Sequence, residues 1–153
     1  MNFEKQKSYQ KEKYDKYKLL ADKTVDSYLN CQGIYLSDIM DMTEKNNDAF
    51  KKVCMGFAST LMPGAVKCTA YACAAASLLN YCGLNDYTVH AGFCLPRSNQ
   101  SFSATKSKFE AERANGVVHP FMITHVFVKF GENIYECYEG ETENIEHFDT
   151  VAM

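Results

Sequence analysis

The sequence has only two arginines, no apolar run near its start and no internal repeat. Its 16 basic and 19 acidic residues give a formal net charge of −3, and no basic cluster marks a nucleic-acid-binding surface. Residues 1–30 mix charges of both signs, which predicts that no signal peptide is present. The longest uncharged stretch, residues 68–85, contains Thr, Ser and Asn, and we interpret it as a buried helix and not a membrane span. We therefore expect neither a nucleic-acid nor a membrane partner.

The sequence also lacks the residue spacings that are typical of metal-binding sites. The seven cysteines include no Cys-x-x-Cys pair and the four histidines are not clustered, so a metal site built from Cys and His is disfavoured. No metal or organic cofactor is expected. Seven is an odd number of cysteines for a disulfide framework. Together with the absence of a predicted signal peptide, it favours reduced thiols and a cytoplasmic location.

The composition that remains is that of an ordinary globular domain. Hydrophobic residues make up 46% and charged residues 23%, which argues against disorder and against a coiled coil. A chain of 153 residues fits a single domain. We divide it into an N-terminal helical part over residues 1–60, a core over residues 63–140 and an acidic tail over residues 141–153.

Two helices are predicted before the core. Tyr, Ala, Val and Leu residues recur at spacings of three and four within residues 2–30, which predicts an amphipathic helix with a solvated charged face. Gly33 ends this helix, and residues 34–42 are expected to form a short apolar connection. Thr43 and the two asparagines that follow it are candidate caps for a second helix, which should run to about Thr60.

An antiparallel sheet is predicted for the second half of the core. Residues 87–95 and 121–130 are predicted strands, and Gly131-Glu132 is a natural two-residue turn into a returning strand over residues 133–138. Since the helices come first in the chain and the strands last, we predict an α+β fold. In it, a central helix packs on an antiparallel sheet, with extra helices on its N-terminal side.

The first two strands are joined by a long polar connection over residues 97–118. It includes a short charged helix candidate at residues 106–114. Connections of this length are uncommon in small domains, so it is interpreted either as a functional loop or lid, or as a disordered insertion. The two alternatives stay open.

Cys68 is the strongest candidate nucleophile among the cysteines. It follows a Pro-Gly turn and Lys67, and it begins a predicted helix of small residues that ends at Gly83. The backbone amides and the dipole at a helix N-terminus favour a thiolate, which is the nucleophilic form of cysteine. The same amides can receive an oxyanion. The other cysteines lack this setting in the predicted structure.

His125 is the candidate general base, because its position at the start of a strand would fix the direction of its ring. It shares a strand face with Phe127, and if the Gly-Glu dipeptide forms the turn, Phe127 lies opposite Glu136. Glu136 is then diagonal to His125 and within side-chain reach, so we expect it to orient the imidazole. A turn one residue longer would place Glu139 opposite His125, and Glu139 is the alternative.

These segments resemble the core of transglutaminase-like proteins. The run Cys68-Thr-Ala-Tyr-Ala, the helix exit at Gly83-Leu and a strand leading to Gly92 are similar to the family's segment around its nucleophilic Cys. The run His125-Val-Phe-Val-Lys-Phe-Gly-Glu-Asn-Ile-Tyr-Glu136 is similar to its His strand and the following acid. The resemblance places the family's acid, usually Asp, at Glu136.

The resemblance covers about residues 63–140 and implies a papain-like fold with thiol acyl chemistry. It implies a Cys-His-Glu triad of Cys68, His125 and Glu136, a thioester intermediate, and a protein, peptide or small amide as substrate. Hydrolysis and transfer to an amine both stay open, as does the oligomeric state. Phe127 stands where the family commonly has Trp, so a Tyr or a backbone amide would have to stabilise the oxyanion. Because Glu136 replaces the family's usual Asp, the alternative is an inactive binding or inhibitor module on the same fold, such as one from a phage or mobile element.

Overall fold

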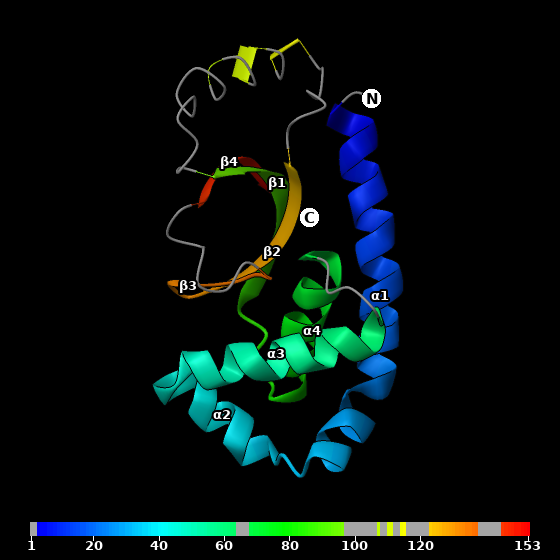
Figure 1. Ribbon diagram of the computed structural model, residues 1–153, viewed down its shortest axis with the longest axis vertical. Coiled ribbons are helices and arrows are strands. Elements are labelled where there is room, and N and C mark those ends of the chain that lie inside the picture. Colours follow the sequence, from blue (N-terminus) through cyan, green and yellow to red (C-terminus); the bar gives the residue numbers. More distant parts are fainter. Residues whose placement is uncertain are drawn as a thin grey trace.

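The helices precede the strands in the chain, as predicted for an α+β fold (Figure 1). The computed structural model describes residues 3–63, 68–96, 123–137 and 145–153, together with positions 107, 110, 111, 114 and 115. In chain order the elements are α1 (Phe3–Gln32), α2 (Leu36–Lys45), α3 (Asn47–Leu61), α4 (Cys68–Tyr81), β1 (Tyr87–Pro96), β2 (Ile123–Phe130), β3 (Asn133–Tyr135) and β4 (Ile145–Ala152).

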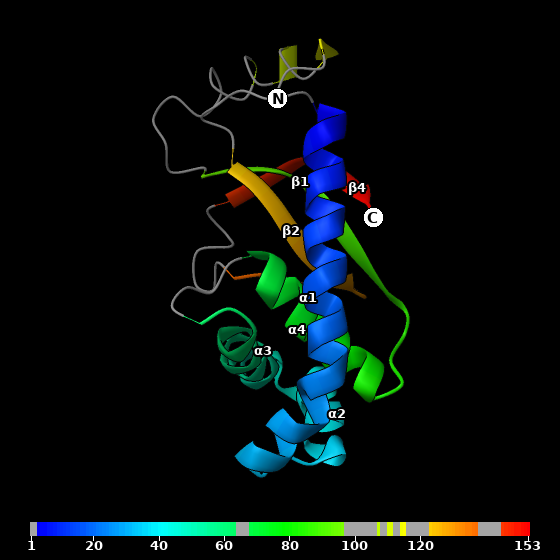
Figure 2. The ribbon, with the colours of Figure 1, turned by 90° about the vertical axis from the view of Figure 1, so that its right-hand side faces the viewer.

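Antiparallel pairing joins the strands of one sheet in the order β3-β2-β1-β4. β1 pairs with both β2 and β4, whereas β3 is a three-residue strand at the edge of the sheet. Helix α4 packs against β2, and α1 and α3 both pack on α4. The two perpendicular views in Figures 1 and 2 show α4 in the middle of the molecule, between the other helices and the sheet.

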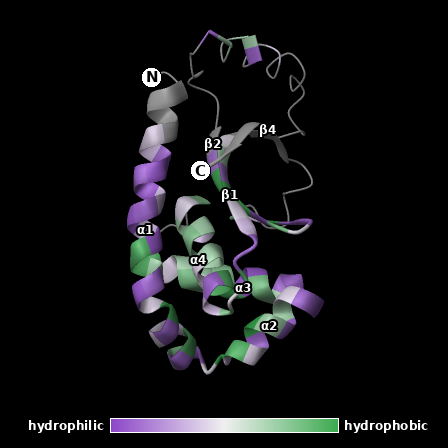
Figure 3. Cartoon of the chain, turned by 180° about the vertical axis from the view of Figure 1, so that it is seen from behind, coloured by the Kyte–Doolittle hydropathy of each residue, from purple (hydrophilic) through white to green (hydrophobic). Residues whose placement is uncertain are grey.

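Helix α4 is the most deeply buried helix. Every residue from Thr69 to Leu79 is buried, and five of these residues are alanines. Their small side chains let neighbouring elements approach the helix closely on all sides. In Figure 3, α4 has mainly hydrophobic shades, whereas α1 carries long hydrophilic stretches. The prediction of a closely packed central helix is therefore confirmed.

Helix α1 is amphipathic, as its sequence pattern predicts. Tyr14, Ala21 and Val25 are buried at helical spacing. On the outer face, Lys11 and Asp15 form an exposed ion pair at 3.0 Å, one turn apart. Among the described residues, no helix has both the length and the apolar character needed to cross a bilayer.

Glycines in the left-handed conformation end α1 and α4. Gly33 has a φ of 67° and Gly83 a φ of 74°. After α4, the N–H of Leu84 donates to the carbonyl of Leu79 and the N–H of Gly83 donates to the carbonyl of Asn80, both at 2.9 Å. This is the Schellman pattern, which satisfies carbonyls that the helix leaves unpaired. Both helices thus end where the sequence predicts.

The prediction that residues 34–42 form a connection is wrong, because most of this segment belongs to α2. The N–H of Tyr35 donates to the carboxylate of Asp38 at 2.8 Å, which caps the first turn of the helix. Ile39 is fully buried and anchors α2 in the core. The apolar pattern of this segment is too short to predict a helix, and burial of Ile39 against the core helps to stabilise one.

The cap of α3 is Asn46 and not Thr43. Thr43 lies inside α2, and its hydroxyl donates to the carbonyl of Met40 at 2.8 Å. The side chain of Asn46 accepts the N–H of Ala49 at 3.2 Å, which is the hydrogen bond of an N-cap. The predicted second helix exists, but it begins at the asparagines.

Two strands differ from the prediction. The returning strand expected over residues 133–138 ends at Tyr135. Residues 145–152, which were assigned to an acidic tail, form β4 and pair with β1. The preference of a residue for a strand depends strongly on its neighbours in the sheet, so the ends of edge strands are hard to predict from composition. The predicted loop over residues 97–118 and its helix at residues 106–114 lie largely outside the described residues.

Replacing Gly83 with alanine should destabilise the protein by about 1 kcal/mol, because an L residue is strained at a φ of 74°. The free energy of unfolding can be measured by urea titration followed by circular dichroism. Asp86, which is exposed just after the turn, provides the control, and Asp86→Ala should change this free energy by less than about 0.5 kcal/mol. Equal effects of the two substitutions would contradict the capping role of Gly83.

Candidate active site

Three predicted site residues converge near the edge of β2. Cys68 is the first residue of α4 and is partly exposed. His125 lies in β2 and Glu136 directly follows β3, and both side chains are buried. The packing of α4 on β2, together with the β2–β3 hairpin, brings these distant parts of the chain to one place.

The β2–β3 hairpin has the register expected from a two-residue turn. Gly131, the first turn residue, has a φ of 60°, and the flanking residues Phe130 and Asn133 pair with each other. Continued one step beyond β3, this register places Glu136 on the same face as His125 and diagonal to it. The predicted position of Glu136 in the hairpin is therefore confirmed.

The carboxylate of Glu136 contacts the imidazole of His125 directly. Oε2 of Glu136 lies 2.6 Å from Nε2 of His125, and the two side chains are 1% and 0% exposed. The longer turn that would have placed Glu139 opposite His125 does not form. Glu139 itself lies outside the described residues.

The thiol of Cys68 also interacts with the imidazole of His125. A side-chain hydrogen bond joins Cys68 to His125. The backbone N–H of Val126 and the hydroxyl of Thr69 also contribute to lowering the pKa of the Cys68 thiol. These donors all favour the negatively charged thiolate.

The amide of Val126 reaches the sulfur because β3 is short. Along a strand, successive amides point alternately to its two neighbours. Phe130 flanks the two-residue turn, so its amide points to β3, as does that of Val128 two residues earlier. The amide of Val126 points to the same side of β2. At that level β3 has already ended at Tyr135, which leaves the edge of the sheet open to Cys68.

Hydrogen bonds and charges in this group shift two pKa values in opposite directions. Burial alone would lower the pKa of His125, but its hydrogen bonds to Cys68 and Glu136, and then the charges of both groups, raise that pKa to about 9. Burial alone would raise the pKa of Cys68, but the hydrogen bond to His125 and the charge of its ring lower it overall. Both shifts favour a thiolate beside an imidazolium over the neutral pair.

The other thiols among the described residues lie in different settings. Burial raises the pKa of Cys82 to about 11 and that of Cys137 to about 12. Burial also raises the pKa of Cys73. Cys31 is exposed near the end of α1, and Cys54 is buried within α3. The surroundings of Cys68, by contrast, lower its pKa.

Phe127 lies between two histidine rings on the His125 face of the sheet. Its ring stacks on those of His125 and His90, with centroids 5.5 Å apart in each case. Burial, and then the charge of Lys129, lower the pKa of His90. A phenyl ring has no hydrogen-bond donor, so this position cannot stabilise an oxyanion as an indole N–H would.

Gln10 is a residue near the site that the sequence analysis missed. Its side chain is buried on α1, and its Oε1 lies 3.5 Å from the hydroxyl of Thr69, next to Cys68. Gln10 precedes the buried Tyr14 by one helical turn. Gln10 therefore lies on the buried face of the amphipathic helix, and this helical spacing is the sequence signal that could have indicated it.

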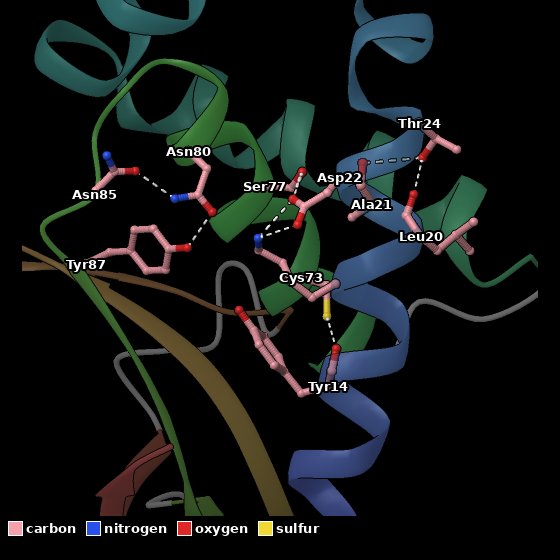
Figure 4. A network of polar contacts seen from close by, with 11 residues as sticks. Tyr14, Leu20, Ala21, Asp22, Thr24, Cys73, Ser77, Asn80, Asn85 and Tyr87 are labelled. Atoms are coloured by element: carbon pink, nitrogen blue, oxygen red, sulfur yellow. Dashed lines mark hydrogen bonds and ion pairs between the residues drawn. The ribbon is translucent and has the colours of Figure 1, made fainter.

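Polar contacts fix the position of α1 along α4 (Figure 4). The thiol of Cys73 donates to the carbonyl of Tyr14 at 3.3 Å. The hydroxyl of Ser77 donates to the carboxylate of Asp22 at 2.9 Å, and Lys18 pairs with the same carboxylate at 2.8 Å. These contacts hold Gln10 beside the first turn of α4.

Comparisons of the chain with protein-family models, with curated proteins and with solved structures find no match. Within the described parts of the chain, no group of three or more His, Cys, Asp or Glu side chains is arranged to hold a metal ion. The geometry of Cys68, His125 and Glu136 is therefore the basis for assigning a function.

Cys68 should react with iodoacetamide faster than Cys31 near neutral pH, although Cys31 is more exposed. Because the pKa of Cys68 is lowered, its rate should level off at a lower pH than that of Cys82, whose rate should keep rising towards a pH of about 11. Mass spectrometry of the labelled peptides across a pH series measures both profiles. A rate at Cys68 no greater than that at Cys31 would contradict the assigned electrostatics.

Glu136→Gln should lower the pKa of His125 below about 9, because it removes the carboxylate that stabilises the imidazolium. The imidazole signals can be titrated by NMR. Since the thiolate depends on the imidazolium, alkylation of Cys68 near neutral pH should also slow. Glu132→Gln changes an exposed carboxylate in the same hairpin and should alter neither property. An unchanged His125 pKa in the Glu136 variant would argue against control by this contact.

Proposed function

We propose that this protein is a cysteine-dependent amide or peptide hydrolase or acyltransferase with Cys68, His125 and Glu136 as its catalytic triad. The observation that carries the proposal is the buried 2.6 Å contact of Glu136 with a His125 ring that also hydrogen-bonds the Cys68 thiol. Thiol, imidazole and carboxylate in this order suit thiol acyl transfer. The thiol-bearing helix packed on an antiparallel sheet supports a papain-like or transglutaminase-like core.

In the acylation step, the Cys68 thiolate attacks the carbonyl carbon of an amide and forms a C–S bond. The carbonyl electron pair moves to oxygen, and backbone N–H groups in the first turn of α4 are suited to stabilise this oxyanion. The His125 imidazolium then gives its proton to the nitrogen as the C–N bond breaks. The amine leaves, and a thioester remains on Cys68.

In the deacylation step, neutral His125 accepts a proton from the nucleophile that attacks the thioester. The C–S bond breaks and returns its electron pair to the sulfur, which restores the thiolate and imidazolium. Attack by water releases an acid, whereas attack by a substrate amine forms a new amide. In both steps Glu136 keeps the ring oriented through Nε2 and stabilises its charged form.

The substrate class is a protein, a peptide or a small amide, since each presents the carbonyl that this chemistry requires. Hydrolysis is the favoured outcome, because Cys68 is partly exposed and water can reach a thioester formed there.

Incubation with p-nitrophenyl acetate, a general acyl donor, tests the proposal without knowledge of the substrate. Mass spectrometry should show one acetyl group on Cys68 that is lost with time, and an added amine such as glycine ethyl ester reveals whether acyl transfer competes with water. His125→Ala should slow acetylation by roughly 10²-fold or more.

Cys68→Ala and Cys82→Ala form the matched pair of controls. The first should abolish acetylation at the site, and the second should leave it intact, because Cys82 lies at the opposite end of α4. Circular dichroism establishes that both variants are folded. A folded wild-type protein in which Cys68 is acetylated no faster than Cys31 would contradict the proposal and favour an inactive binding module.

A further inference from the structure

We propose that Asn47 is a positioning residue, which holds Glu136 against His125 by fixing the adjacent Tyr135. This inference rests on the proposed function, because it concerns how the same site is aligned. The hydrogen bonds of Asn47 that we consider go to the hairpin and not to His125 or Cys68. Its effect passes through the strand that leads to Glu136.

Asn47, the first residue of α3, makes hydrogen bonds to both ends of β3. Its Oδ1 accepts the hydroxyl of Tyr135 at 2.8 Å, and its Nδ2 donates to Oδ1 of Asn133 at 2.9 Å. The side-chain amide of Asn47 thus bonds to the first residue of this three-residue strand through its donor and to the last residue through its acceptor. We refer to Asn47, Asn133 and Tyr135 as the hairpin clamp.

The strand β3 depends on the clamp because the sheet supports it weakly. It pairs with β2 at three positions, and none of the described strands lies on its other side. Short edge elements with few ladder hydrogen bonds open most readily. Tyr135 is fully buried and packs edge-on against Phe50, with ring centroids 4.9 Å apart. Its hydroxyl requires a partner at that depth, and Asn47 is that partner.

The position of Tyr135 determines that of Glu136, the next residue. Glu136 directly follows Tyr135, the last β3 residue of the ladder, so the place of Tyr135 sets where the backbone of Glu136 begins. Its carboxylate lies 2.6 Å from the imidazole, and a displacement of about 1 Å would lengthen this contact beyond hydrogen-bond range. The clamp therefore governs how much of the His125 ring is held as imidazolium, and through it the thiolate of Cys68.

The preceding residue, Asn46, makes a well-matched control. It has the same side chain and belongs to the same helix terminus, but its side chain accepts the N–H of Ala49 and caps α3. Substitution of Asn46 by alanine should weaken the start of α3. In the observed hydrogen bonds, Asn47 reaches the hairpin and Asn46 stays within its own helix.

The experiment compares Asn47→Ala with Asn46→Ala in the full chain, using the pH profile of Cys68 alkylation by iodoacetamide. In Asn47→Ala the profile should move to higher pH, and the rate near neutral pH should fall roughly three- to tenfold, which corresponds to a pKa change of about half a unit to one unit. In Asn46→Ala the profile should stay in place although urea unfolding shows lower stability. Tyr135→Phe, which keeps the ring but removes the hydroxyl, should move the profile in the same direction as Asn47→Ala.

Three outcomes would overturn the inference. If Cys68 remains the fastest thiol and the Asn47→Ala profile matches that of wild type, the positioning role is wrong while the proposed function stands. If both asparagine variants shift the profile equally, the effect is one of helix stability. If wild-type Cys68 reacts no faster than Cys31, the proposed function fails and this inference fails with it. Should Asn47→Ala not fold, Tyr135→Phe decides between these outcomes by the same measurement.

Discussion

The buried contact between Glu136 and His125 is the interaction on which the rest of the site depends. Removing a carboxylate and an imidazole from water costs several kcal/mol per ion, and only good geometry with further hydrogen bonds repays it. Here the two atoms lie 2.6 Å apart, and the ring also bonds to the thiol of Cys68. Loss of any one of the three groups would leave a buried polar neighbour without its counterpart, so their protonation states form a single coupled system.

The fold satisfies this constraint by ending one strand early. If the ladder continued past Tyr135, a strand residue would occupy the amide of Val126, and the sulfur of Cys68 could not. The small residues of α4 complement this gap, because they let the helix pack closely enough on β2 for its first residue to reach the edge of the sheet. The polar contacts between α1 and α4 then keep Gln10 beside that first turn.

The local parts of this arrangement are predictable from the sequence, and the parts that depend on distant partners are not. Gly83 marks the end of α4, and Gly131 determines the register that carries Glu136 to His125, because a positive φ favours glycine at both places. By contrast, β4 pairs with β1 although it follows a run of acidic residues, and that run conceals the strand-favouring Ile, Phe, Thr and Val within residues 145–152. The clamp residue Asn47 is equally hidden, since nothing near it in sequence indicates that its amide bonds to a strand some 86 positions away.

The identity of the acid follows from its place in the hairpin. Glu136 is diagonal to His125 and not opposite it, and diagonal neighbours on paired strands are about 7–8 Å apart, a distance that long side chains can span. Aspartate is shorter by one methylene and reaches less far across such a diagonal. A glutamate is therefore the carboxylate that suits a strand ending at Tyr135, and its contact with the imidazole is intact.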